Sequence, residues 1–119
     1  MTKSLTIALL AVSLLAAPAA AHHGWSSYDN DNAITLTGKI TEASYTYPHG
    51  TIMLETPGKI WLAVLAPPSR MSARGLPSSD LTVGAQATVE GYPSRQDPKE
   101  MRAERITIHG KTKIGRAHV

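Results

Sequence analysis

The feature that most constrains the fold is a strict alternation of apolar and polar residues from Ile34 to Thr41. A period of two, rich in β-branched residues, is typical of a β-strand that buries one face. The alternation shifts phase between Ala43 and Tyr47, where we expect a β-bulge. The chain is therefore expected to be built on a sheet that begins near residue 34.

Four more strands and one short helix are expected further along. The strands cover residues 51–56, 59–65, 86–92 and 101–109, and the helix covers residues 67–75. Prolines are tolerated in the first turn of a helix, and Gly75 suits its end. Pro57-Gly58 lies between two apolar stretches, which indicates a hairpin turn.

Three strands, a helix and two strands follow one another in the order of an OB-type barrel. A five-stranded sheet has exposed edges unless it closes on itself. We therefore predict a mainly β fold, a small five-stranded OB-like barrel with one short helix between strands 3 and 4. An open α+β sheet and a small β-sandwich are the alternatives. The barrel domain is expected to cover residues 33–113, after a polar, turn-rich arm of residues 22–32.

The amino terminus has the parts of a secretory signal peptide. Lys3 supplies a positive charge, residues 5–17 are almost wholly apolar, and small residues follow up to Ala21. The apolar stretch is shorter than the roughly 20 residues that a membrane-spanning helix needs. We therefore expect residues 1–21 to be a signal peptide and the mature protein to be periplasmic or secreted, with no membrane association after cleavage.

Three cleavage positions are open, and each leaves a histidine near the new terminus. Cleavage before His22 places alanine in both small-residue positions ahead of the cut, and so does cleavage before Ala20. Cleavage before Ala21 puts Pro18 in one of these positions, which is unfavourable. The first cut makes His22 the terminal residue, whereas the other two place a histidine third.

The last six residues are expected to be foreign to the gene. Residues 114–119, Ile-Gly-Arg-Ala-His-Val, are the translation of a common sequencing adapter. The natural reading frame is then expected to continue past Lys113, and His118 is assigned no role.

Composition argues against several classes of function. The chain has no cysteine, so neither a disulfide nor a thiolate is available. The net charge of +3 falls to +1 without Lys3 and Arg116, and such a domain attracts nucleic acid or anionic lipid weakly. The acidic residues are scattered, and the sequence has no nucleophile elbow or phosphate-binding loop. No catalytic residue is assigned, and we expect neither an enzyme nor a nucleic-acid partner.

The histidines form the one arrangement suited to binding a ligand. If His22 is the first residue, its amine and its own imidazole can close a chelate on a metal, and His23 or His49 can add a further nitrogen. A third-position histidine can instead hold Cu(II) or Ni(II) in a square plane with the amine and two backbone amides. Copper(II) heads the divalent affinity order and favours tetragonal nitrogen sites. We therefore predict a metal site at His22, His23 and His49, with a copper ion as its cofactor.

Each candidate has a plainer structural interpretation. Adjacent histidines can be a solvated terminus, and His49 can shape a turn through a backbone hydrogen bond. Met53 is expected to share a strand face with His49, but methionine usually serves packing. Trp25 and Trp61 are expected to be core or staple residues, and His109 is expected at the surface.

The chain also resembles a family of small exported bacterial proteins, classed as a domain of unknown function. The shared marks are Ala-His-His-Gly-Trp from Ala21, Leu-Thr-Gly-Lys-Ile from Leu36, Tyr-Pro-His-Gly from Tyr47, Trp61 followed by Pro67, and the stretch 81–93. Members more often carry His-His-Ser and Asn-Pro-His. Gly24 and Tyr47 are therefore departures, and Tyr47 removes a turn-capping amide. The resemblance implies a periplasmic β-domain and points to His22, His23 and His49.

We therefore expect a periplasmic copper-binding protein that handles or buffers metal. The main alternative is a non-metal binding or accessory module that recognises a small solute or a periplasmic protein partner. An oxidative copper enzyme is a third class, for which the sequence shows no substrate surface.

Overall fold

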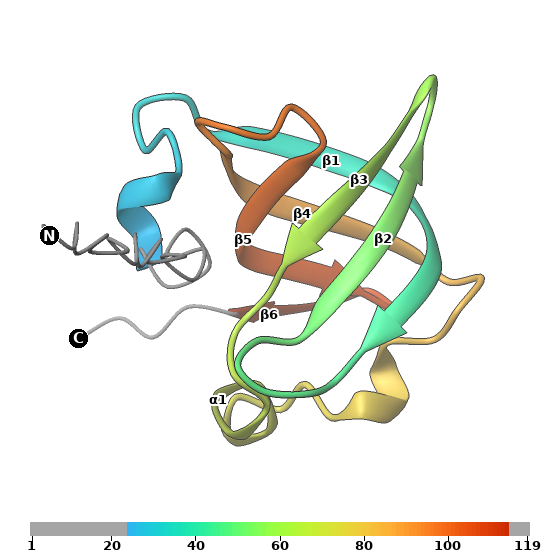
Figure 1. Cartoon of the computed structure of the whole chain (residues 1–119). Helices are drawn as coiled ribbons and strands as arrows, with labels where there is room; N and C mark the ends of the chain where they lie inside the picture. Colours follow the sequence, from blue (N-terminus) through green and yellow to red (C-terminus); the bar gives the residue numbers. More distant parts are fainter. Residues whose placement is uncertain (1–23, 115–119) are drawn as a thin grey trace, which may run out of the picture.

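Six strands, one α-helix and two 3-10 helices make up residues 24–114, the part of the chain described in the computed structural model (Figure 1). The strands are β1 (Ile34–Ser44), β2 (Thr51–Thr56), β3 (Lys59–Val64), β4 (Gln86–Pro93), β5 (Glu100–Ile108) and β6 (Lys111–Ile114). The helix α1 (Pro68–Ala73) lies between β3 and β4, and the 3-10 helices are η2 (Gly24–Ser27) and η3 (Ser78–Asp80). The predicted mainly β fold with one short helix is confirmed.

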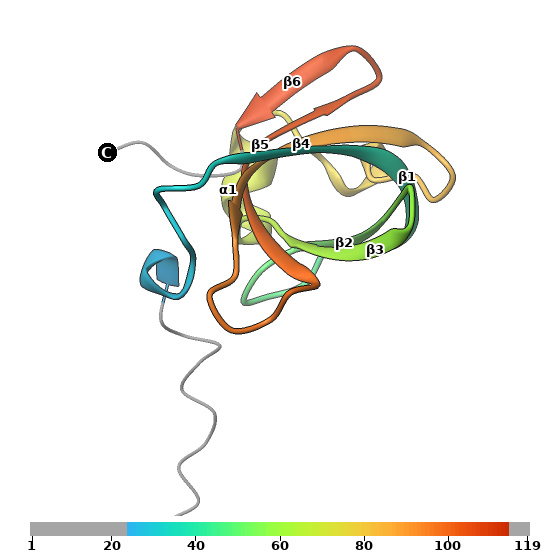
Figure 2. The same cartoon turned by 90° about the horizontal axis from the view of Figure 1, so that it is seen from above.

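The strands form one closed barrel. They pair in the order β3-β2-β1-β4-β5-β6, and a further pairing joins β3 to β5. This joining ladder is parallel and short, with residues 62–64 opposite residues 100–102. The ring β1-β2-β3-β5-β4 is visible from above in Figure 2. Its connectivity is that of an OB-type barrel, which confirms the closed barrel over the open sheet and the sandwich.

One strand is additional to the predicted five. β6 pairs with residues 105–108 of β5 and lies outside the closed ring (Figure 2). Its two-residue turn has positive φ at His109 and Gly110, as a type I′ hairpin turn requires. Histidine is an unusual first residue for such a turn, so the sequence signal was weak. His109 is exposed, as predicted.

The bulge predicted in the first strand exists, but it comes earlier than expected. The register between β1 and β2 shifts between Ile40 and Glu42. Residues 34–39 of the same strand pair with β4 on the other side. A bulge increases local bending, and β1 bends as it passes from β4 to β2.

Aliphatic side chains from the strands and α1 fill the barrel. Ile40, Leu54, Met71, Val89 and Met101 have no exposed surface. Burial alternates along β2, as the period of two predicts, and partly buried Trp61 packs against this core. None of the helices within residues 24–114 has the length and hydropathy to cross a bilayer.

A substitution at Gly91 tests how closely the backbones of β4 and β5 approach each other. A side-chain carbon at Gly91 would overlap the carbonyl oxygen of Arg102 on β5. We expect Gly91→Ala to lower the free energy of unfolding by about 1–3 kcal/mol, because the strands would have to separate. Gln86→Ala, at an exposed position of the same strand, is the control and should change it little. Urea denaturation measures both, and equal stability of the two variants would contradict the close approach.

Candidate ligand-binding pocket

A pocket of about 460 Å³ lies on the side of the barrel where β3 meets β5. Four separate stretches of chain contribute to its wall. The lining residues are Gly24, Ser27, Tyr28, Pro48, His49, Thr51, Val64, Ser94, Gln96, Asp97, Glu100 and Arg102. The β1–β2 and β4–β5 connections and the β2–β3 face contribute to this wall, and these are the parts that OB folds use to bind ligands.

His49 is held at the pocket by the residue that follows it. The N–H of Gly50 donates to the carbonyl of Ala66 (2.9 Å), and its own carbonyl accepts from the N–H of Leu65 (2.8 Å). Gly50 is buried, and any side chain there would overlap the end of Met71. The Pro-His-Gly motif therefore anchors the backbone beside His49, whose side chain is half-buried with its Nδ1 atom inside the protein.

The start of the described chain folds back onto the barrel instead of extending away from it. Trp25 in η2 lies beneath the guanidinium of Arg102, 4.3 Å from the ring centroid, and makes an edge contact with Tyr92 at 6.0 Å. Backbone hydrogen bonds from Asp29 to Pro93 (2.8 Å) and from Arg95 to Ser27 (3.0 Å) tie the arm to the β4–β5 connection. Gly24 is thereby held in the same pocket wall as His49.

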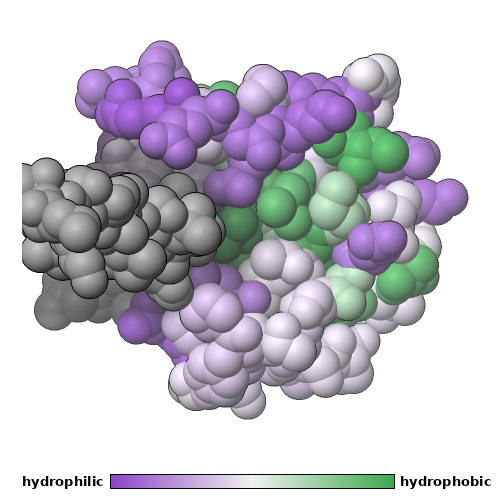
Figure 3. Space-filling model, viewed as in Figure 1, coloured by the Kyte–Doolittle hydropathy of each residue, from purple (hydrophilic) through white to green (hydrophobic). Residues whose placement is uncertain are grey.

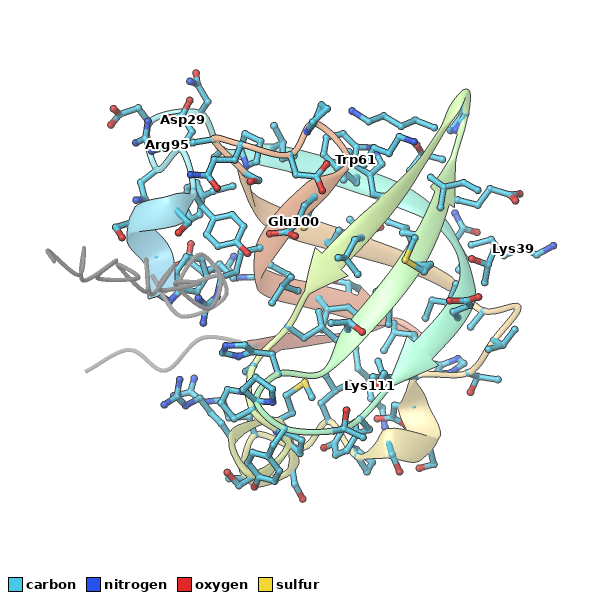
Figure 4. All side chains as sticks on the ribbon, in the orientation of Figure 1. Asp29, Lys39, Trp61, Arg95, Glu100 and Lys111 are labelled. Carbon is cyan, nitrogen blue, oxygen red and sulfur yellow. The ribbon has the colours of Figure 1, made fainter. Side chains whose placement is uncertain are left out.

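Tyr28 and Glu100 join the arm to the first residue of β5. The buried Tyr28 donates its hydroxyl hydrogen to Oε2 of Glu100 over 2.6 Å. Burial first, and then this bond to the carboxylate, raise the pKa of Tyr28 well above its ordinary value. The phenol is protonated at neutral pH and serves as a hydrogen-bond donor. In Figure 4 the Glu100 side chain points from β5 toward the arm.

Asp29 and Arg95 add a weaker link at the outer end of the arm (Figure 4). Their charged atoms are 3.9 Å apart, and surface pairs of this kind contribute little. Hydrogen bonds from the Asn32 side chain and the Asp31 backbone lower the pKa of Asp29. This turn is therefore ordered mainly by local hydrogen bonds.

An apolar surface continues from the pocket along the outer faces of β2 and β3. In Figure 3 hydrophobic side chains gather over these strands, beside the arm. The outward-facing apolar residues are Met53, Ile60, Leu62 and Val64.

A separate hollow of about 650 Å³ over the β2–β3 turn is lined by residues 55–60 and contains no histidine.

Of the three histidines predicted to bind metal, the structure describes only His49. His49 lines the pocket, whereas His22 and His23 lie outside the described residues. Met53 does not line the pocket. Within residues 24–114, no three His, Cys, Asp or Glu side chains gather closely enough to hold a metal by themselves.

Sequence reasoning missed several residues of the pocket. Tyr28, Glu100 and Arg102 line it, and Arg102 is 8% exposed. The sequence gives no signal for Arg102, because its place between Met101 and Ala103 is the outward phase of an alternating strand, where an exposed arginine is expected. Nothing in the sequence indicates that Tyr28 contacts Glu100, which lies 72 residues further along the chain.

The closed ring and its lateral pocket define an OB-type β-barrel protein. The chain belongs to a family of unknown function, DUF6152, whose model matches residues 9–102. This match confirms the resemblance to a domain of unknown function. No curated protein matches the chain closely enough to count as a relative.

Comparison with solved structures supports the fold. The Stn1–Ten1 complex of S. pombe contains a chain with a TM-score of 0.50 and 13% identity, over 66% of this chain and 59% of that one. A complex of TiaS with tRNA and ATP contains another, with a TM-score of 0.48 and 19% identity, over 68% and 19%. This chain therefore spans less than two thirds of either protein, and the likeness to the Stn1–Ten1 complex concerns the fold alone.

Replacing Trp25 by alanine should loosen the arm without unfolding the barrel. The variant loses the stacking on Arg102 and the aromatic contacts, which together contribute about 1–2 kcal/mol. We expect the amides of Asp29 and Arg95 to exchange hydrogen about tenfold faster. The amide of Ile40, bonded to Ala85 inside the barrel, is the internal control and should not change. Unchanged exchange at Asp29 would show that Trp25 does not hold the arm.

Proposed function

We propose that this protein is a periplasmic copper-binding protein that handles or buffers metal. Its ligands are the mature amino terminus with His22, His23 and His49. One observation carries the proposal: His49 and Gly24, far apart in the sequence, line the same pocket, and Gly24 directly follows the two histidines.

Covalent geometry supports the reach of the terminus. Two residues span at most roughly 7 Å of extended chain, so His22 and His23 are tethered within that distance of Gly24. A histidine side chain adds further reach. This short tether, together with the shared pocket wall of Gly24 and His49, supports a site at which the amine, an arm imidazole and the His49 imidazole bind one ion.

The chemistry of the donors favours copper. A terminal amine and imidazoles are nitrogen ligands, and Cu(II) binds such ligands more tightly than the other first-row divalent ions do. The proposal also depends on export, for which the leader pattern of residues 1–21 is the support.

The pocket is less suited to nucleic acid. Its wall carries the two carboxylates of Asp97 and Glu100 beside the single guanidinium of Arg102. A groove that follows a phosphate backbone needs several cations and aromatic platforms.

A non-metal binding module remains the second candidate. The volume of about 460 Å³ falls in the range of small-molecule pockets, and Arg102 lines it while stacked on Trp25. A small organic solute with an anionic group would fit this wall. The metal experiment below separates the two candidates.

Copper titration of the mature protein tests the proposal. Protein exported to the periplasm is purified, its terminus is confirmed by mass spectrometry, and Cu(II) is titrated against a competing chelator. For protein that begins at His22 we expect one tight site per chain. His49→Ala should weaken it at least tenfold, about 1.4 kcal/mol, because one nitrogen donor is lost.

Two controls define the site. His109→Ala, at an exposed turn on another part of the barrel, should leave the affinity unchanged. A four-residue Gly-Ser-Gly-Ser extension ahead of His22 moves the amine away and leaves no histidine in third position, because His22 becomes the fifth residue and His23 the sixth, so it should weaken binding as His49→Ala does. Equally weak binding by the wild type, the extended protein and His49→Ala would leave only the second candidate.

A further inference from the structure

Two carboxylates line the pocket, and the structure holds them differently. Asp97 is exposed in the β4–β5 connection, where its Oδ1 accepts a hydrogen bond from the backbone N–H of Lys99 (2.9 Å). Glu100 is half-buried, and its Oε2 accepts the hydroxyl hydrogen of Tyr28 (2.6 Å). Asp97 is therefore committed to its own loop, whereas Glu100 is held by a residue from the arm.

The backbone of Glu100 is fixed as firmly as its side chain. It pairs with Leu62 in the parallel ladder that closes the barrel. Its carbonyl oxygen also accepts the N–H of Ser94 (2.9 Å). A carboxylate attached to such a backbone and oriented by Tyr28 needs little reorganisation to bind a ligand.

Charge balance indicates what that ligand is. The amine and imidazoles of the proposed copper site are all neutral when they bind, so they leave the double positive charge of the ion uncompensated. Arg102 adds another positive charge to the same wall. Burying unbalanced charge is costly, and a carboxylate in the pocket offsets it. Mixed nitrogen and oxygen donors are common in tetragonal Cu(II) sites.

We infer that Glu100 supplies an oxygen ligand to the copper ion, and that Tyr28 positions the carboxylate without touching the metal. This inference rests on the proposed function. Its basis is that Glu100, His49 and Gly24 line one pocket, with the Tyr28 hydroxyl fixing one carboxylate oxygen. Hydrogen-bonded partners of this kind commonly orient metal ligands.

The test replaces Glu100 by glutamine in mature protein that begins at His22. Glutamine keeps the length of the side chain and still accepts the hydrogen bond from Tyr28, but it lacks the charge. We expect Glu100→Gln to lower Cu(II) affinity at least tenfold and to change the electron paramagnetic resonance spectrum, because one donor atom is replaced. Thermal unfolding of the metal-free proteins checks that each variant is folded.

Asp97→Asn is the matched control. It removes the same charge from the same pocket, yet Asp97 is exposed and screened, so we expect about a twofold change in affinity and an unchanged spectrum. Tyr28→Phe should lower the affinity by roughly 10- to 100-fold while the donor atoms stay the same.

The outcomes distinguish the ligand role of Glu100 from the proposed copper-binding function on which it rests. Tight binding by the wild type with the same affinity and spectrum in Glu100→Gln overturns the ligand role of Glu100 and leaves the copper site intact. Equal losses in Glu100→Gln and Asp97→Asn without a spectral change also overturn it, because they indicate a general charge effect. A wild type that binds no copper overturns both.

Discussion

The parallel ladder between β3 and β5 is the constraint on which the rest of the structure depends. It spans only residues 62–64 and 100–102, and the N–H of Leu62 extends it by donating to the carbonyl of Lys99 (2.7 Å). Without it β3 and the first part of β5 would be sheet edges, which expose unpaired backbone groups. The ladder also places Arg102 of β5 opposite Val64 of β3, and both residues line the pocket together with Glu100.

The arm provides contact partners for Arg102 and Glu100, the two polar residues of β5 that line the pocket. Arg102 needs partners because it is almost fully buried in a β-strand, and Trp25 and Tyr28 provide aromatic faces at 4.3 Å and 5.9 Å. Tyr28 in turn needs a partner for its buried hydroxyl, and Glu100 provides one. The arm and the barrel thus satisfy each other's polar groups.

Much of the barrel could be predicted from local patterns. The alternation after Ile34, the Pro57-Gly58 turn and the apolar stretches indicated five strands and one helix, because burial of one strand face leaves a period of two in the sequence. The position of the bulge and the type I′ turn at His109-Gly110 could not be predicted, since both depend on pairing between strands. Of the pocket residues, only His49 was singled out from the sequence, as a metal ligand, and that role stays a prediction. Tyr28, Glu100 and Arg102 were not singled out, because 72 residues separate the two partners of the Tyr28–Glu100 hydrogen bond.

The pocket wall is built from distant segments of the chain, so a ligand bound in the pocket is expected to stabilise the folded protein. The wall is drawn from the arm, the β1–β2 connection and the start of β5, segments that come together only in the folded chain. A ligand that bridges them holds the barrel together at the β3–β5 ladder, its shortest strand pairing. Whatever molecule fills the pocket must therefore also raise the melting temperature, since it binds the folded chain and not the unfolded one. A thermal shift screen of metals and small anions would consequently detect a natural ligand that belongs to either of these classes.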